Sequence, residues 1–209
     1  NAPLLDQKRL SKLSACYDFA ARARLGQMLF VGEGNFSFSL SIARERGVSA
    51  QALISTCYEA EEDLGDAAYS NAAALLKLGV QVKTGVDATD LSLSFGKRQF
   101  HSIVFQFPNL ASRSPLYGQN PNHVLVTRFL KSCTRHLKPK GQVIISTVDS
   151  PFYEGAFKMD LAAQKAGFHP PAVYTFNPKH FAGYVHQNTS NEGTAIDGRT
   201  DFATFAFSV

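Results

Sequence analysis

The sequence has few cysteines and no long apolar run, and both absences exclude classes of protein. Its three cysteines, Cys16, Cys57 and Cys133, are far apart and odd in number, so they form neither a metal-ligand spacing nor a disulfide framework. We expect buried thiols in a reducing compartment, and no metal site. No apolar run approaches the ~20 residues that cross a bilayer. The N-terminus lacks the basic-apolar-small pattern of a signal peptide, so no membrane partner is expected.

A block of Lys and Arg is also missing, although the chain is basic, with a net charge of +4 and a pI near 9.0. This balance permits nucleic-acid binding without establishing it. We expect residues 1–26 to form an N-terminal helical extension and residues 27–209 to form one domain. Within residues 4–24 the apolar residues recur at helical spacing and the basic residues lie mostly off that stripe. This pattern favours a helix docked on the domain over a basic arm that binds RNA.

Short apolar runs alternate with helical patterns along most of the chain. Strands are expected at residues 27–32, 52–58, 80–87, 101–107, 142–148, 171–177 and 201–209. Helices are expected at residues 35–46, 60–78, 123–138 and 155–166. Pro139 and Gly141 are expected to stop the third of these helices. The alternation predicts an α/β fold with a mainly parallel seven-stranded sheet, and the last two strands, with no helix between them, predict a C-terminal antiparallel hairpin.

The stretch "LFVGEGNFSFSLSIARERG", residues 29–47, places Gly32 and Gly34 where the first strand turns into the first helix. Glycines there let the backbone approach a ligand closely, and the helix N-terminus beyond them offers free N–H groups. The fingerprint of NAD-binding proteins requires Gly or Ala at its third position. Ser37 stands at that position, which weakens an NAD interpretation without excluding it.

Carboxylates follow the next two expected strands. Glu59 could accept both ribose hydroxyls, and Asp87 could accept from an adenine amino group. Each acid could instead be a helix cap or a solvated charge. Because ligands of such folds bind at the carboxyl ends of the strands, the glycine loop and the two acids together favour an adenosyl ligand.

The fourth strand ends in "FQFPN", Phe105 to Asn109. This place is typical of the polar-aromatic-proline tetrad of S-adenosylmethionine-dependent nitrogen methyltransferases, which orients the acceptor nitrogen toward the methyl group. The C-terminal hairpin also favours a methyltransferase sheet. The sequence therefore predicts a Rossmann-like class I methyltransferase with S-adenosylmethionine as its cofactor.

Five blocks, "VGEGNFSFSLSIA", "STCYEAEEDL", "GVDATDL", "HSIVFQFPN" and "FAGYVHQNT", resemble the 25S ribosomal RNA uridine-N3 methyltransferase-like family, from about residue 28 to 190. By position, the resemblance implies cofactor contacts from Gly32, Glu33, Gly34, Asn35 and Phe36 at the methionine, Tyr58 and Glu59 at the ribose, Asp87 and Ala88 at the adenine, and Phe105. It implies acceptor-side or catalytic roles for Gln106, Phe107, Pro108, Asn109, Tyr184 and His186.

Two departures from the family concern the acceptor. The family commonly has Asn-Phe-Pro-His where this chain has Gln106 to Asn109, and a pair of arginines where it has Gln187 and Asn188. Fewer basic groups weaken the expectation of a phosphate-rich substrate. Two acceptors stay open: a base of ribosomal RNA, with uridine N3 implied by the resemblance, and a nitrogen or oxygen of a small molecule. A non-catalytic cofactor-binding module is a third interpretation.

Aromatic and histidine side chains could contact the acceptor. Phe107 and Tyr184 are expected as exposed stacking platforms, and Phe38 as part of the core. His186 is expected either as a proton acceptor or substrate binder, or as a structural histidine. The location expected for such an enzyme is the cytoplasm, or the nucleolus of a eukaryote.

Overall fold

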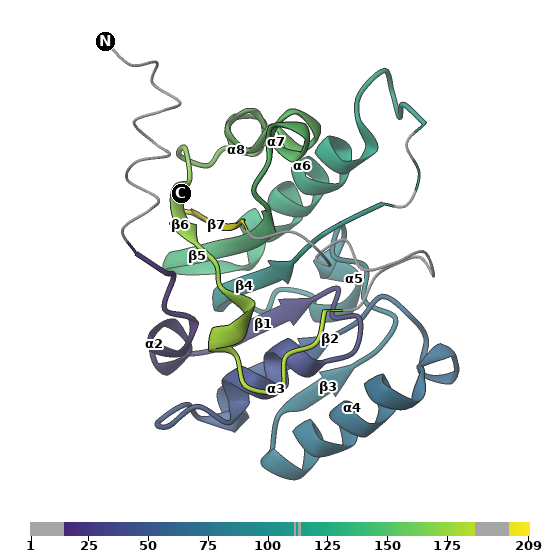
Figure 1. The fold of residues 1–209 in the computed structure, drawn as a ribbon, viewed down its shortest axis with the longest axis vertical. Helices are drawn as coiled ribbons and strands as arrows, with labels where there is room; N and C mark the ends of the chain where they lie inside the picture. Colours follow the sequence, from purple (N-terminus) through teal and green to yellow (C-terminus); the bar gives the residue numbers. More distant parts are fainter. Residues whose placement is uncertain (1–14, 111, 113, 187–200) are drawn as a thin grey trace.

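Seven strands form one sheet, in the order β3-β2-β1-β4-β5-β7-β6, in the computed structural model, which describes residues 15–110, 112, 114–186 and 201–209 (Figure 1). The strands are β1 (Met28–Val31), β2 (Leu53–Thr56), β3 (Gln81–Lys83), β4 (Phe100–Gln106), β5 (Leu137–Val148), β6 (Ala172–Thr175) and β7 (Phe202–Phe207). Every neighbouring pair is parallel except those made by β7, which runs antiparallel to both β5 and β6. The expected mainly parallel sheet with a C-terminal antiparallel hairpin is confirmed.

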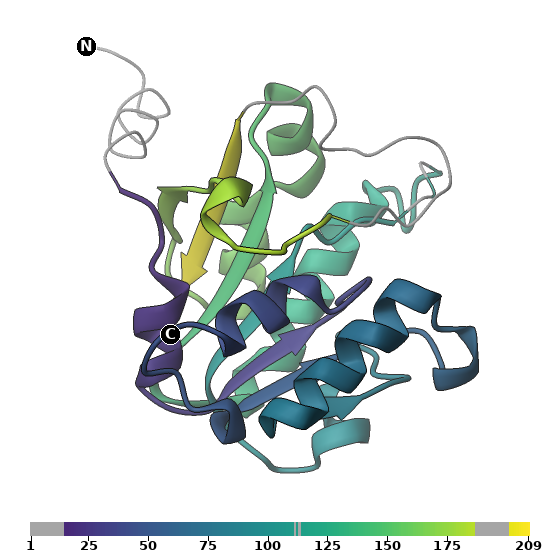
Figure 2. The ribbon, with the colours of Figure 1, turned by 60° about the horizontal axis from the view of Figure 1, so that its bottom comes forward.

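Helices cover both faces of this sheet (Figures 1 and 2). One face carries α2 (Phe19–Arg24), α3 (Ser37–Ala43) and α4 (Asp66–Leu78), and the other carries α5 (Leu91–Phe95), α6 (Pro121–Cys133), α7 (Pro151–Phe157) and α8 (Met159–Ala166). Short 3₁₀ helices are η1 (Ala50–Ala52), η2 (Glu61–Asp63), η3 (Thr134–His136) and η4 (Pro178–His180). Within the described residues, no helix is both long and apolar enough to cross a membrane.

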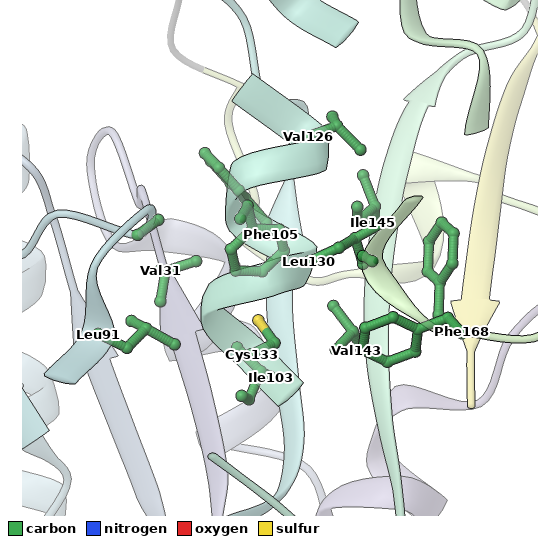
Figure 3. Packing of buried hydrophobic residues seen from close by; sticks show 14 of the residues in the cluster. Val31, Leu91, Ile103, Phe105, Val126, Leu130, Cys133, Val143, Ile145 and Phe168 are labelled. Carbon is green, nitrogen blue, oxygen red and sulfur yellow. The ribbon is translucent and has the colours of Figure 1, made fainter. Parts of the chain in front are cut away.

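The core on the second face is built by α6 lying over β1, β4 and β5 (Figure 3). Val126, Leu130 and Cys133 of α6 are fully buried against strand residues that include Ile103 and Ile145. Because helices cover both faces, the central strands are buried on both sides and their sequences are almost continuously apolar. This explains why short apolar runs, and not alternating ones, marked the strands.

The largest boundary error of the sequence analysis lies between the third expected helix and the strand after it. α6 begins at Pro121, where the side chain of Asn120 accepts from the Asn122 amide, and it ends at Cys133. Pro139 and Gly141 lie inside β5, in a stretch where the pairing with β4 shifts register. Lys140 adopts a left-handed φ of 61° there. The two stop signals mark this β-bulge, and they do not mark a helix end.

Other expectations are also corrected. The helix expected over 155–166 is divided into α7 and α8 at Lys158, whose φ is 47°, and the one expected over 60–78 begins as α4 only at Asp66. α5 was not expected. Cys16 is exposed, with its Sγ atom 3.1 Å from Thr175 Oγ1, whereas the other two cysteines are buried.

The expected N-terminal extension and its basic stripe fall mostly on residues 1–14, which lie outside the described residues. The described part of that extension contains α2. Arg22 on α2 donates to Ser102 Oγ, to the His101 carbonyl and to the Lys140 carbonyl, at 3.0, 3.0 and 2.8 Å. These bonds fix α2 to the start of β4 and to the bulge of β5.

An aromatic cluster on the first face joins α3 to the chain beyond β6. Its members are Phe19, Phe30, Phe38, Phe176, Phe181 and Tyr184. The ring of Phe38 is central: its centroid lies 4.9 Å from that of Phe181 and 5.4 Å from that of Tyr184. Phe38 is a core residue, as expected, and its contacts fix Tyr184 near the end of β1.

We expect Phe38→Ala to lower the free energy of unfolding by about 3–5 kcal/mol, since a buried ring is lost and a cavity remains. Urea titration followed by circular dichroism measures the change. Phe152→Ala removes a ring that is 65% exposed and should change the free energy by less than about 0.5 kcal/mol. Equal losses in the two variants would contradict the central role given to Phe38.

Candidate active site

A cavity of about 480 Å³ opens at the carboxyl ends of β1, β2 and β4. The strand order reverses between β1 and β4, and ligands of open α/β sheets bind at such a reversal. The cavity brings together every expected site residue except Phe36: Gly32, Glu33, Gly34, Asn35, Tyr58, Glu59, Asp87, Ala88, Phe105, Gln106, Phe107, Pro108, Asn109, Tyr184 and His186. Residues that are far apart in the sequence therefore line one cavity.

The glycine loop is shaped by contact with β4. Gly32 has a left-handed φ of 62°, and a Cβ atom added there would lie 2.3 Å from Phe105 Cε2. Only glycine fits this position, because a side chain would both strain the backbone and overlap the ring. Phe36 also has a left-handed φ, of 59°, at the start of α3. This turn directs its side chain into the core, where it is fully buried, so Phe36 does not line the cavity.

Side chains of the loop occupy amides at the start of α3 that the sequence analysis left free for a ligand. Asn35 Oδ1 accepts from the Ser37 amide at 3.1 Å, and Glu33 Oε2 accepts from the Ser39 amide at 3.1 Å. Both side chains therefore satisfy N–H groups of the first turn of α3, which have no partner within the helix. The loop can therefore bring its backbone close to a ligand. It leaves fewer N–H groups at the α3 N-terminus for that ligand than expected.

The carboxyl group of Glu33 is buried, with 6% of the residue exposed. It also accepts from Ser39 Oγ at 2.9 Å, and that hydroxyl lies 2.6 Å from Ser55 Oγ on β2. Burial raises the pKa of Glu33 to about 7, although the two bonds from Ser39 act in the opposite direction. Glu33 thus lines the cavity, and its hydrogen bonds through Ser39 connect the glycine loop to β2.

The side chains expected at the adenosine lie beyond β2 and β3. Tyr58 is 70% exposed, and Glu59 lies beside it in the cavity wall. Asp87 Oδ1 accepts from the amide and the hydroxyl of Thr89, both at 2.7 Å. Asp87 therefore stabilises its own turn, and Oδ2 is the atom left to accept from an adenine amino group.

Gln106 at the end of β4 is the most unusual polar residue of the cavity. Both Oε1 and Nε2 are buried, and neither has a hydrogen-bond partner in the described part of the chain. A buried amide without partners costs about 1–3 kcal/mol, so such a group is a strong candidate for ligand contact. Phe107 beside it has a left-handed φ of 51°, and its amide donates to the Ser146 carbonyl at 2.8 Å.

The segment Tyr184-Val185-His186 crosses the start of α3 (Figure 2). Asn35 Nδ2 and Ser37 Oγ lie 2.9 and 3.0 Å from the Val185 carbonyl, and the Val185 amide lies 3.0 Å from Ser37 Oγ. These contacts hold the segment against the glycine loop, so the loop and the 184–186 segment form one wall.

Two side chains of the 184–186 segment are in contact with each other, and one of them packs against Phe107. Tyr184 Oη lies 3.3 Å from His186 Nδ1, and the ring of His186 lies 5.0 Å from that of Phe107. Burial, and secondarily the Glu33 carboxyl group, raise the pKa of the Tyr184 phenol well above its ordinary value. Phe107 and Tyr184 are half-buried in aromatic contacts, which corrects their interpretation as exposed platforms. Gln187 and Asn188 lie outside the described residues.

The sequence analysis missed the far wall of the cavity. It consists of residues on α6 and on the loop before it: Leu110, Leu116, Val124, Leu125 and Arg128. The loop from residue 108 to 120 is rich in turn residues and has no periodic pattern. The apolar stripe of α6 was the one available signal, and it indicated burial without indicating a cavity.

A family model described as rRNA (uridine-N3-)-methyltransferase BTM5-like matches residues 29–188. The human ferredoxin-fold anticodon-binding domain-containing protein 1 is 31% identical over 172 residues, which cover 76% of this chain and 27% of that protein. An uncharacterised protein of Arabidopsis thaliana is 28% identical over 177 residues, covering 78% of this chain and 82% of that protein. The chain thus spans about a quarter of the human relative.

Solved structures with the same fold include two methyltransferases. The glycopeptide N-methyltransferase MtfA has a TM-score of 0.55 and 13% identity, covering 100% of this chain and 99% of that one. The 16S rRNA methyltransferase KamB has a TM-score of 0.53 and 13% identity, covering 99% and 92%. MtfA is also known with sinefungin, an analogue of S-adenosylmethionine. These similarities establish the class I methyltransferase fold.

We expect Gly32→Ala to reduce the affinity for S-adenosylmethionine at least about tenfold, because the new Cβ would displace Phe105 or the loop. Calorimetric titration measures the affinity. Gly155→Ala is the control, since a Cβ there meets no atom of the described residues within 4 Å, and its affinity should equal that of the unaltered protein. Unchanged affinity in Gly32→Ala would contradict the position given to the glycine loop.

The raised pKa of Glu33 makes stability depend on pH. The unfolded carboxyl group ionises near its ordinary pKa of 4.5, whereas the folded one keeps its proton until about pH 7. Glu33 therefore contributes stability that is full below about pH 4.5 and is lost as the pH rises to 7. The unfolding free energy of the ligand-free protein, minus that of Glu33→Gln, should fall by about 3 kcal/mol from pH 4 to pH 8.

Urea titrations at each pH measure this difference. Glu45→Gln, which alters an exposed carboxylate, is the matched control for the loss of a carboxyl group. A pH-independent difference for Glu33→Gln would mean that the folded carboxyl group has the same pKa as the unfolded one, and would contradict the raised pKa.

Proposed function

Because the chain belongs to the rRNA (uridine-N3-)-methyltransferase BTM5-like family, we propose that it methylates N3 of a uridine in ribosomal RNA. The family and the fold identify a class I S-adenosylmethionine-dependent methyltransferase. The RNA acceptor, the uracil base and the nitrogen atom are the parts that we propose.

The residues of the cavity fit S-adenosylmethionine. The absent side chain of Gly32 leaves room for close backbone approach, the ring of Tyr58 is exposed beside Glu59, and Asp87 Oδ2 can accept from an amino group. The cofactor supplies a methyl group on a positively charged sulfur, so the leaving group needs no acid from the protein. Two acids of the cavity, Glu59 and Asp87, suit a cationic ligand.

The observation that carries the proposal is the amide of Gln106, which is buried and has no hydrogen-bond partner among the described residues. The edge of uracil presents a donor, N3–H, between two carbonyl acceptors. An amide offers one acceptor and a two-hydrogen donor. Nε2 can therefore donate to a uracil carbonyl, where negative charge gathers as N3 loses its proton, and this contact stabilises the anion that reacts.

The N3 proton needs an acceptor, and His186 is the candidate that we propose. In the tautomer that carries its hydrogen on Nδ1, His186 donates to Tyr184 Oη. Nε2 of the imidazole would then be the basic atom, and it would take the proton as N3 becomes bonded to the methyl carbon. Phe107, whose ring packs against the imidazole, would hold the ring in this orientation.

A small-molecule nitrogen or oxygen methyltransferase is the second candidate, and one observation favours it. Among the described residues that line the cavity, Arg128 is the single Arg or Lys. RNA affinity depends strongly on contacts between cations and phosphates, whereas a partly apolar pocket suits a small acceptor.

Transfer of labelled methyl from S-adenosylmethionine separates the two candidates. Total RNA and a metabolite extract, both from cells lacking this protein, would be incubated in parallel with the chain. Label that maps to N3 of one uridine in ribosomal RNA is the expected result. Label confined to the low-mass fraction would replace the proposal with the second candidate.

Gln106→Ala should lower kcat on the labelled acceptor about 10- to 100-fold, because a hydrogen bond to the developing charge is lost. The affinity for S-adenosylmethionine should stay within about twofold, since Gln106 contacts the acceptor side. Gln164→Ala, on the exposed face of α8, is the matched control. Unchanged kcat in Gln106→Ala would remove the residue from the acceptor site.

A further inference from the structure

Among the described residues that line the cavity, Arg128 is the single Arg or Lys. It comes from α6, which packs over β1, β4 and β5. Leu110 and Leu116, on the loop before α6, line the same cavity. A phosphate group of an acceptor would therefore find its cationic partner at Arg128.

Tyr117 lies beside this arginine, in the loop that leads to α6. This loop projects from the body of the molecule (Figure 1). It is 74% exposed and has a left-handed φ of 52°, as does Gly118 with 69°. The two residues form a tight turn closed by two hydrogen bonds between Leu116 and Gln119, of 2.9 and 3.0 Å. Gly and Asn favour such turns, so a tyrosine is an unusual residue at this position.

The two side chains are joined. The guanidinium carbon of Arg128 lies 5.4 Å from the centroid of the Tyr117 ring, and Nη2 donates to Tyr117 Oη at 3.3 Å. This cation–π contact holds both groups in place before any ligand arrives. A guanidinium leaves further N–H donors for a phosphate, and the exposed ring offers a second face to a base.

We propose that Tyr117 and Arg128 form a binding subsite for the nucleotide that adjoins the target base in a single-stranded RNA. The base stacks on Tyr117 and its phosphate is bound by Arg128, while the target base enters the cavity between Leu116 and Gln106. This inference rests on the proposed RNA acceptor. It adds a subsite outside the cofactor and target-base positions, made by a loop and a helix that the sequence did not assign to the site.

The test uses the full chain and a single-stranded RNA of about nine nucleotides centred on the labelled uridine. Fluorescence anisotropy gives its affinity at several salt concentrations. Arg128→Gln should weaken binding about tenfold and reduce the slope of log affinity against log salt by about 0.7, the value of one phosphate contact on a single strand. Arg128→Lys should keep the slope but weaken binding, because a lysine binds phosphate without the planar fork.

Tyr117→Ala should weaken RNA binding about tenfold with no change of slope, whereas Tyr117→Phe, which keeps the ring, should bind within about twofold of the unaltered protein. Arg135→Gln and Tyr69→Ala change exposed residues elsewhere and are the matched controls. All variants should bind S-adenosylmethionine equally well, which shows that the cavity is intact.

The outcomes separate this subsite from the proposed function. If the unaltered chain methylates ribosomal RNA while Arg128→Gln and Tyr117→Ala bind it with unchanged affinity and slope, the subsite is wrong and the function stands. A loss of S-adenosylmethionine affinity in both variants would show a structural role and would also overturn the subsite. If the unaltered chain neither binds nor methylates RNA, both proposals fail.

Discussion

The absent side chain of Gly32 is the constraint on which the site depends. β1 and β4 are parallel neighbours whose register pairs Val31 with Phe105, so the residue after Val31 meets the Phe105 ring. A Cβ there would lie 2.3 Å from that ring. Because glycine fits, the chain can leave β1 for α3 on one face of the sheet, while the chain leaving β4 reaches α6 on the other. The cavity opens between the segment that follows β1 and the segment that follows β4.

The loop after Gly32 is stabilised by its own polar side chains. Glu33 and Asn35 cap amides of α3, and Ser37 with Asn35 holds the Val185 carbonyl. The Asn35–Val185 bond joins residues 150 positions apart. A wall assembled in this way is formed before the ligand arrives, so binding does not have to supply the cost of ordering it. The same bonds explain why fewer amides of α3 are left for a ligand than a bare glycine loop would offer.

The sequence allowed the sheet, its hairpin and the glycine loop to be predicted, because buried strands and a strand-to-helix glycine turn leave local patterns. Features set by tertiary contacts could not be predicted. Pro139 marked an irregularity but could not show whether it ended a helix or bulged a strand. Phe36 lies within the glycine motif, yet its left-handed backbone turns the ring into the core. Arg128 and Tyr117 follow no motif, and only the packing of α6 over β4 and β5 brings Arg128 to the cavity.

The described part of the cavity wall offers little positive charge to a nucleic acid. It carries one arginine, Arg128, together with the carboxyl groups of Glu59 and Asp87, so electrostatic attraction for an RNA strand is weak there. Recognition of an RNA acceptor by this cavity must then depend on short-range contacts: the amide of Gln106 with the edge of the target base, and the ring of Tyr117 with its neighbour. Such contacts select a base in a particular setting, whereas a broad positive surface would bind any strand.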